Sequence, residues 1–592
     1  MGLETLCFAI NLDTVGNMPC NPAIGGTGKG HLVRELDALG GEMARAADAA
    51  CIQYRILNLG KGPAVHSLRA QADRRRYQEV MKRTLERQEH LRLIQAEVVD
   101  IGVESGRVVS VTTHTGAVWR CRAAVVATGT YLHGLTIVGE VLRDSGPDGL
   151  APSGPLSERL AALGLSLRRF KTGTPPRVNA RSVDFTKMQV QEGDAEPEPF
   201  SFETEHVPEN RARCYLTYTT PETHAIIRAN LDRSPLYSGV IEGVGPRYCP
   251  SIETKVMTFP DKERHQLFIE PMGLGTEELY VQGFSSSMPE EVQVRMLHSV
   301  PGLEHAEIMR AAYAIEYDCV DPLELLPTLE TRKISGLYGA GQFNGSSGYE
   351  EAAVQGFAAG VNAALKILGR PPFVLKRSEA YIGALIDDLV TRGTNEPYRM
   401  MTSRSEYRLL LRQDNADERL TPIGREYGLV DDDRWALFCR DREVKQAELH
   451  RLETTSIKLA DLRAAAPEGA ELGEIGGSAI ELMRRPYISY DLIAKVIGRG
   501  EGVTPAMAQR IETEIRYAGY IAREERIIRD IQRHENVKIP DDFDYAPIET
   551  MTLESREKLT KIRPRTLAQA GRIPGVSPSD LAQLSIVLLK LK

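Results

Sequence analysis

The sequence lacks the features that would place the chain in a membrane or outside the cell. It has no run of about 18 apolar residues that could span a bilayer. Its opening, MGLETLCFAI, has neither the basic region, the apolar stretch nor the cleavage site of a signal peptide. These absences predict a soluble, cytoplasmic protein with no membrane contact.

The chain also lacks paired cysteines. Its eight cysteines include no CxxC pair and no cluster with metal-ligand spacing, in a chain of 592 residues. Such patterns are the usual signs of a zinc site or a disulfide framework. The sequence therefore predicts mostly free thiols and no bound metal. Cys51, Cys121 and Cys439 lie in apolar runs, which is typical of core residues.

Positive charge is not in excess, since the formal net charge is −8. That value argues against a uniformly basic nucleic-acid binder, but phosphate binding needs only a local patch. Arg404, Arg408 and Arg412 recur every four residues, and on a helix they would present three guanidinium groups along one face. Residues 561–592 carry six Lys or Arg against only Asp580. A solvated charged face explains each patch equally well.

The segment CNPAIGGTGKGH, residues 20–31, is the most informative in the chain. It places the thiol of Cys20 before a glycine-rich bend that would begin a helix. Bends of this kind bring backbone N–H groups close to phosphates or flat cofactors. The dipole of a following helix favours a thiolate, so we prefer a functional Cys20 to the ordinary small core residue.

The order of β-rich and glycine-rich segments suggests an interrupted dinucleotide-binding domain. Residues 91–111 read as two β-rich runs joined by a polar turn, and another buried strand ends at Gly129. Residues 335–368 combine a short strand, a glycine-rich turn and a long helix of small residues, which would aim a helix N-terminus at a pyrophosphate. After about Pro371 the pattern changes to long amphipathic helices.

One element expected of such a domain is missing from the chain as given. Dinucleotide-binding flavoproteins begin with a strand, a G-x-G-x-x-G turn and a helix, about 30 residues in all. Here LETLCFAI reads like the second strand of that unit, and GGTGKG is not a Walker loop because Gly30 replaces the required Ser or Thr. We expect a late start codon or a truncated gene model. A chain that truly began at Met1 would be expected to bind flavin weakly.

Seven ordered strings resemble the glucose-inhibited division protein A family, also called MnmG, whose members modify the wobble uridine of tRNA. They are the segment at 20–31, KGPAV at 61–65, KTGTPPR at 171–177, GPRYCPSIE at 245–253, AIEYD at 314–318, GYEEAAVQG at 348–356 and EPYRM at 396–400. The resemblance implies an α/β, FAD-binding Rossmann-like core of the two-dinucleotide flavoprotein type, an inserted nicotinamide and substrate domain, and an all-helical C-terminal region.

The resemblance also implies domain boundaries. The first part of the FAD-binding domain, without its first βα unit, would occupy residues 1–175, and its return segment residues 331–370. The inserted domain would lie between them at 176–330. Two helical domains would follow at 371–480 and 481–592, the second contacting tRNA and a protein partner.

Residue by residue, the resemblance carries over a candidate site. Cys20 and Cys249 match cysteines proposed to assist catalysis. The predicted FAD contacts are Val98, Ser153, Lys171, Gly339, Gly341, Gln342 and Glu351. The segment that matches a nicotinamide-binding stretch comprises Gly245, Pro246, Arg247, Tyr248, Cys249, Pro250, Ser251, Ile252, Glu253, Thr254, Lys255, Val256, Met257, Thr258 and Phe259.

The residues themselves support these assignments unequally. Gln342 lies inside a glycine turn, whereas Val98 and Ser153 have weak local signals and a structural role explains them as well. Helix capping is a fair explanation of Glu351. Without the resemblance, the residues around Cys249 favour a catalytic role no more than a structural one.

The chemistry implied by the resemblance uses methylenetetrahydrofolate as carbon donor, glycine or ammonium as nitrogen donor, FAD as carrier and NADH as reductant. A thiol adding to C6 of uracil would make C5 nucleophilic. The implied partners are tRNA, a second copy in a homodimer, and an MnmE-type GTPase with which it forms a heterotetramer.

Two alternatives remain open. The folate-dependent tRNA uridine methyltransferase TrmFO shares the flavin core but ends without the long helical extension. A chain without its pyrophosphate loop could also serve only as a scaffold that binds tRNA or the GTPase.

Overall fold

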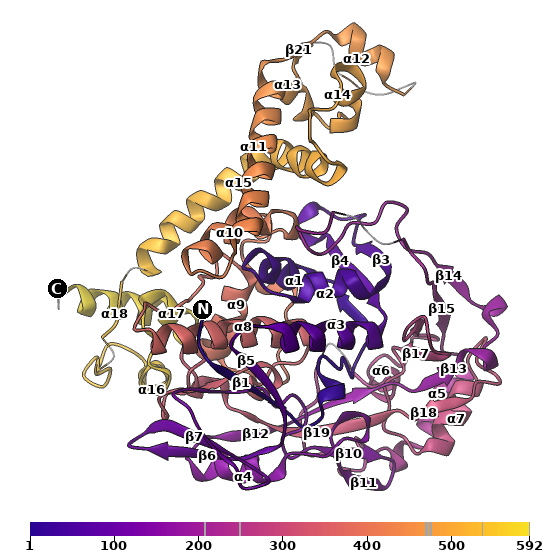
Figure 1. Ribbon diagram of the computed structural model, residues 1–592, viewed down its shortest axis with the longest axis vertical. Coiled ribbons are helices and arrows are strands. Elements are labelled where there is room, and N and C mark those ends of the chain that lie inside the picture. Colours follow the sequence, from indigo (N-terminus) through magenta and orange to yellow (C-terminus); the bar gives the residue numbers. More distant parts are fainter. Residues whose placement is uncertain are drawn as a thin grey trace.

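The computed structural model describes the chain except for residues 206–208, 248–249, 468–471, 473–475, 536, 541 and 591–592, and except for the side chains of 530–535 and 590. Figure 1 shows a broad α/β body from which a helical arm projects. Among the described residues no helix is long and apolar enough to cross a membrane. No group of three or more potential metal ligands occurs within the described ranges.

The first structural unit of the body is built from two separated parts of the chain. Strand β1 (Thr5–Ala9) pairs in parallel with β5 (Leu91–Gln95), and β9 (Ala124–Val126) pairs in parallel with β20 (Leu337–Gly339). The second pair joins segments from before and after the inserted region. One apolar core runs from Met18 to Leu420 and includes residues of both segments. The early and late segments therefore fold as a single unit.

Helices and two small antiparallel sheets complete this unit. The helices are α1 (Lys29–Ala38), α2 (Met43–Ala50), α3 (Arg74–Arg87), α4 (Gly154–Ala162) and α8 (Tyr349–Ile367). One sheet has the order β2-β4-β3 and the other β6-β7-β8. Their strands are β2 (Ala23–Gly25), β3 (Cys51–Leu57), β4 (Ser67–Ala72), β6 (Val98–Glu104), β7 (Arg107–Thr113) and β8 (Val118–Arg120).

The inserted region is a domain with its own six-stranded sheet and core. The strand order is β14-β15-β16-β17-β13-β18. The strands are β13 (Arg177–Asn179), β14 (Gln189–Gln191), β15 (Cys214–Tyr218), β16 (Gln266–Pro271), β17 (Glu278–Gln282) and β18 (Ile308–Arg310), and the helices are α5 (Pro221–Arg228), α6 (Ile252–Thr258) and α7 (Glu290–His298). Its apolar core extends from Val178 to Ala306 and is separate from the core of the first unit.

Two long strands connect the inserted domain to the first unit. Strand β12 (Leu167–Thr174) leads into it and β19 (Tyr313–Val320) leads out, and the two are antiparallel neighbours along their whole length. They share a sheet with β10 (Leu135–Val138) and β11 (Val141–Asp144). Because entry and exit are paired, the two domains are held together by a sheet and not by a flexible hinge.

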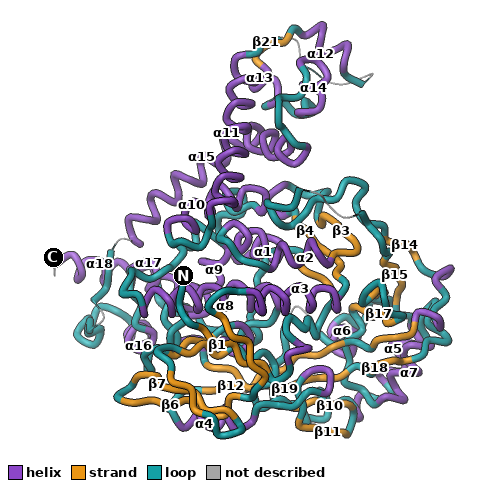
Figure 2. The backbone as a smooth tube through the Cα atoms, in the orientation of Figure 1, coloured by secondary structure: helices purple, strands orange, loops and turns teal. Residues whose placement is uncertain are grey.

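In the described residues of the C-terminal region, helices predominate and the strands form one short pair, β21 (Ser456–Ile457) and β22 (Gly477–Ser478), as Figure 2 shows. Its helices are α9 (Tyr381–Asp387), α10 (Ala416–Glu426), α11 (Asp432–Thr454), α12 (Leu459–Ala465), α13 (Ala479–Met483), α14 (Tyr490–Ile497), α15 (Pro505–Glu535), α16 (Leu553–Ile562), α17 (Leu567–Arg572) and α18 (Pro578–Lys590). One core spans Leu452 to Ile515, so the boundary expected at residue 480 runs through a single unit. A further core, from Ile539 to Leu588, belongs to the last helices.

Candidate active site

Residues 20–31, here called the thiol segment, lead through a short strand into the first helix of the body. Strand β2 follows Cys20 and ends at Gly25, whose φ of +89° and close approach to the Leu68 carbonyl leave no room for a Cβ atom. Helix α1 begins after Gly28, which has a φ of +78° and provides no side-chain cap. No side chain caps α1, and the N–H groups of Lys29 and Gly30 donate to the backbone carbonyl of Gly26 at 3.0 and 2.8 Å. Cys20 itself is exposed.

The second glycine-rich turn produces a matching helix end. Strand β20 ends at Gly339, a short turn covers Gly341–Asn344, and α8 begins after Gly348 with no side-chain cap. Gly348 has a φ of +134°, a conformation that side chains rarely adopt. The predicted strand, turn and helix are thus present, with Gln342 half-buried inside the turn.

Lys29 joins the two helix ends. Its Nζ lies 2.7 Å from Oε2 of Glu350 and 3.1 Å from Oε2 of Glu351. The other oxygen of Glu350 accepts the N–H of Gly25 at 2.8 Å, and that of Glu351 accepts the N–H of Met400 at 3.0 Å. Burial alone would lower the pKa of Lys29, but the two carboxylates outweigh burial, so its pKa lies above the usual value.

This arrangement changes the interpretation of two residues. Both oxygens of Glu351 are engaged within the protein and its side chain is fully buried, which supports a structural role over a direct contact to FAD. Lys29 was given no role by the sequence. Its place after Gly28 is visible there, but the pairing with two carboxylates from a distant segment becomes apparent only after folding.

Lys171 lies beside the start of the predicted nicotinamide segment. Its N–H donates to the Val244 carbonyl at 3.0 Å, and a Cβ atom on Gly245 would lie 3.4 Å from Lys171 Cδ. The side chain of Lys171 is buried. A predicted FAD contact and the predicted nicotinamide segment are therefore neighbours, as a site that uses both cofactors requires.

Within that segment, side chains hold helix α6 in place. Ser251 caps the helix by accepting the N–H of Thr254, and the Lys255 ammonium donates to the Gly283 carbonyl at 3.2 Å. Glu253 is fully buried and accepts the hydroxyl of Ser286 at 2.5 Å. Tyr248 and the candidate catalytic Cys249 lie outside the described residues, so the shared catalytic role of Cys20 and Cys249 stays a prediction.

The remaining predicted FAD contacts lie on separate elements of the first unit. Val98 begins β6 opposite Thr113, and Ser153 is buried at the start of α4, where its N–H donates to the Tyr131 carbonyl at 2.8 Å. Gly339 and Gln342 belong to the second glycine turn. Their contacts to FAD stay predictions.

The predicted stripe of three arginines is wrong in its geometry. The chain from 405 to 412 contains turns and no helix, and Arg408 is exposed whereas Arg412 is buried. Arg404 stacks 4.3 Å above the ring of Tyr398.

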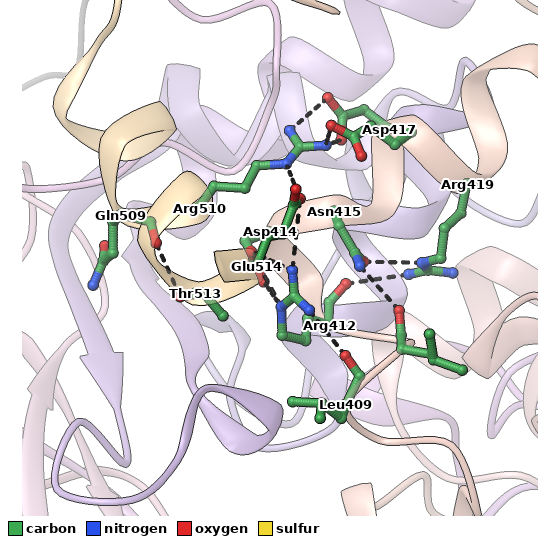
Figure 3. A network of polar contacts seen from close by, with 12 residues as sticks. Leu409, Arg412, Asp414, Asn415, Asp417, Arg419, Gln509, Arg510, Thr513 and Glu514 are labelled. Carbon is green, nitrogen blue, oxygen red and sulfur yellow. Dashed lines mark hydrogen bonds and ion pairs between the residues drawn. The ribbon is translucent and has the colours of Figure 1, made fainter. Parts of the chain in front are cut away.

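Arg412 is the member of the predicted stripe that the structure removes from the surface. Its side chain is 1% exposed, its Nε donates to Asp414 at 2.9 Å, and its Nη1 donates to the Leu409 carbonyl at 3.0 Å (Figure 3). It is therefore committed to the protein interior and cannot contact RNA as predicted. Arg404 and Arg408 remain candidates.

Arg412 belongs to a network of ion pairs at the base of the arm (Figure 3). Arg510 of α15 makes two hydrogen bonds to Asp417, at 2.8 and 3.0 Å. Lys445 of α11 lies 2.5 Å from Glu514 and 2.6 Å from Glu418. Both long helices of the arm are thus joined by ion pairs to the start of α10.

Replacing Lys29 with methionine should destabilise the junction of the two helix ends. The change leaves two buried carboxylates without a cation, which costs about 3–5 kcal/mol in comparable buried pairs. Amide exchange should therefore become faster in α1 and α8. The matched control is Lys82→Met, which removes an exposed partner of Asp13 and should leave exchange in both helices unchanged. Unaltered exchange in Lys29→Met would show that the pair does not hold the helix ends together.

Comparisons with known proteins agree along the whole chain. Residues 1–371 match the family model "Glucose inhibited division protein A". Residues 432–525 and 527–592 match the models for the C-terminal helical domain and the C-terminal helical bundle of the tRNA modifying enzyme MnmG/GidA.

Relatives and a solved structure show the same similarity. The "tRNA uridine 5-carboxymethylaminomethyl modification enzyme MnmG" of Caldicellulosiruptor saccharolyticus is 55% identical over 100% of this chain and 95% of its own length. The enzyme of the same name from Geobacillus kaustophilus is 52% identical over 99% and 94%. A crystal structure of Aquifex aeolicus GidA is 45% identical, with a TM-score of 0.91 over 99% of this chain and 94% of that one, which confirms the predicted fold class. The chain therefore belongs to the glucose-inhibited division protein A (MnmG/GidA) family.

Proposed function

We propose that the chain is an FAD- and NADH-dependent enzyme that installs a (carboxymethyl)aminomethyl group at C5 of the wobble uridine of tRNA. The observation that carries the proposal is the full-length similarity to relatives named for this modification, at 52–55% identity. The site agrees with it, because two uncapped helix ends and an exposed thiol loop lie on one unit of the body.

The residues present fit an FAD group. The N-termini of α1 and α8 have no side-chain caps, and Lys29 lies between them, paired with Glu350 and Glu351. Such ends favour phosphate and electron-rich ring edges. Gln342, Ser153 and Val98 are the proposed further contacts. FAD, when bound, supplies the capacity to accept and pass on a hydride.

NADH is the proposed reductant, held by residues 245–259. The support for this assignment is the position of Gly245 against Lys171, which places the segment next to a proposed FAD contact. Methylenetetrahydrofolate is the proposed carbon donor, with glycine or ammonium as nitrogen donor.

The proposed role of the chain's thiols is to activate the uracil ring. One of Cys20 and Cys249, as thiolate, would add to C6 and move the C5–C6 electron pair toward O4, which makes C5 a nucleophile. After C5 bonds to the one-carbon unit, the other cysteine, as thiolate, would take the C5 proton and become a thiol, and the first sulfur would leave from C6 as thiolate. The exposed position of Cys20 suits a group that must reach a base.

The proposed partners are tRNA, a second copy of the chain and an MnmE-type GTPase, in the cytoplasm. Arg404, Arg408 and the basic residues of 561–592 are the proposed tRNA contacts. The TrmFO alternative is less well supported, because residues 432–592 match the C-terminal helical models of the MnmG/GidA family. A purely structural scaffold would not need an exposed cysteine in the same unit as two uncapped helix ends.

Replacing Cys20 with serine should abolish tRNA modification. A hydroxyl is a far weaker nucleophile than a thiolate at neutral pH, so the nucleoside product should fall at least about 100-fold. The measurement is mass spectrometry of nucleosides from tRNA treated with enzyme, partner GTPase and cofactors. Cys439→Ser on α11 is the matched control and should keep full activity. Full modification by Cys20→Ser would remove this thiol from the mechanism.

Reversing the charge of Arg408 should weaken tRNA binding. If Arg408 contacts one phosphate, Arg408→Glu should lower the affinity. The slope of log affinity against log salt concentration should become shallower by about one, because one fewer counterion is released. Binding is measured by fluorescence anisotropy over a salt series. Arg107→Glu, an equal change at the exposed start of β7, is the control. Equal slopes for Arg408→Glu and the unaltered chain would contradict a phosphate contact.

A further inference from the structure

Side chains from three elements distant in the sequence donate hydrogen bonds to backbone carbonyls of residues 17–20. Arg74 Nε of α3 donates to the Asn17 carbonyl at 2.6 Å, and Arg177 Nη2 of β13 donates to the Pro19 carbonyl at 2.9 Å. The Tyr280 hydroxyl of β17 donates to the carbonyl of Cys20 itself. Three of the four carbonyls from Asn17 to Cys20 are thus held by side chains distant in the sequence.

Two of these donors come from the inserted domain and act as a pair. Arg177 and Tyr280 are directly opposite each other on the neighbouring strands β13 and β17. The guanidinium of Arg177 lies 5.5 Å from the centre of the Tyr280 ring, and its side chain is completely buried. Nη1 of Arg177 also donates to the Pro175 carbonyl at 3.3 Å. A buried arginine that donates to two carbonyls is fixed in one orientation.

The other end of the loop is fixed through Asp148. This carboxylate pairs with Arg74, accepts the side-chain amide of Asn17 at 3.0 Å, and lies 3.3 Å from Arg310 of β18. Burial alone would raise the pKa of Asp148, but Arg74 outweighs burial, so the pKa is below its usual value. Asp148 is therefore held as a carboxylate, which keeps both arginines in place.

The loop between these anchors is in a conformation that needs support. Met18 has a φ of +42°, in the left-handed region that is unfavourable for a side chain, and is buried. Strain of this kind persists only where surrounding contacts impose it. The contacts fall on carbonyl oxygens, so they fix the backbone of Cys20 without occupying its sulfur.

We propose that Arg177 and Tyr280 are positioning residues that hold the Cys20 thiol in place for the reaction, so that the inserted domain sets the position of a thiol carried by the other domain. This inference rests on the role proposed above for Cys20. The pair acts through the Pro19 and Cys20 carbonyls and does not touch the base. Reactions that depend on an oriented nucleophile lose rate steeply when it is displaced by about 1 Å.

The test is Tyr280→Phe, which removes one hydroxyl and keeps the ring under Arg177. The matched control is Tyr218→Phe, on strand β15 of the same sheet. Loss of one hydrogen bond should make amide exchange in residues 16–22 about 2- to 10-fold faster. The kcat for tRNA modification should fall about 10-fold while KM for tRNA and the amount of bound flavin stay unchanged. Arg177→Lys keeps the charge but loses the planar guanidinium that donates to two carbonyls. It should also make exchange faster and kcat lower.

Each result decides the inference. Faster exchange together with a lower kcat, absent from Tyr218→Phe, would support it. Unchanged exchange in both Tyr280→Phe and Arg177→Lys would overturn the backbone contact. Faster exchange with wild-type kcat would overturn the positioning role. Exchange requires no activity, so failure of the thiol mechanism is recognised separately by full modification in Cys20→Ser.

Discussion

Lys29 stands between two buried carboxylates at the point where two distant parts of the chain meet. Glu350 and Glu351 begin α8, and Lys29 begins α1. A buried charge without a partner is strongly unfavourable, so each helix end depends on the other. The backbone N–H groups of Gly25 and Met400 bind the same carboxylates. The thiol segment, the second glycine turn and the start of the C-terminal region therefore meet around one cation.

This constraint explains how an interrupted domain can form a single site. The parallel pairing of β9 with β20 brings the return segment beside the first part of the body. The Lys29 cluster then sets how the helix that follows each glycine turn is placed. Arg177 and Tyr280 bind the carbonyls of Pro19 and Cys20 and so join this segment to the inserted domain. The thiol is thus located by contacts from both domains.

Local sequence signals predicted the elements of the site well. The strand before Cys20, the glycine bend before α1 and the helix after Gly348 were all predicted, because glycines with positive φ and a change from β-rich to helical pattern are local properties. The pattern of three arginines was misread as a helix. Spacing of four residues is compatible with a helix but does not require one, and the chain from 405 to 412 contains turns in which Arg412 is buried.

What could not be predicted depends on contacts between distant residues. Nothing local marks Tyr280 as a donor to Cys20, or Arg412 as the partner of Asp414 in a buried network. The boundary expected at residue 480 failed for the same reason, since the core from Leu452 to Ile515 is built from several helices that pack only in the folded arm. Periodicity shows which face of a helix is apolar but not which helix it meets.

The most direct test of the account is the absorbance spectrum of the purified chain after incubation with FAD and desalting, followed by addition of NADH without oxygen. The account predicts that flavin is retained by the paired helix ends, against the weak binding expected of a chain without the G-x-G-x-x-G turn, and that its visible absorbance bleaches when NADH is added. A colourless protein after desalting, or retained flavin that NADH does not reduce, would contradict the claim that these helix ends and residues 245–259 form a redox site.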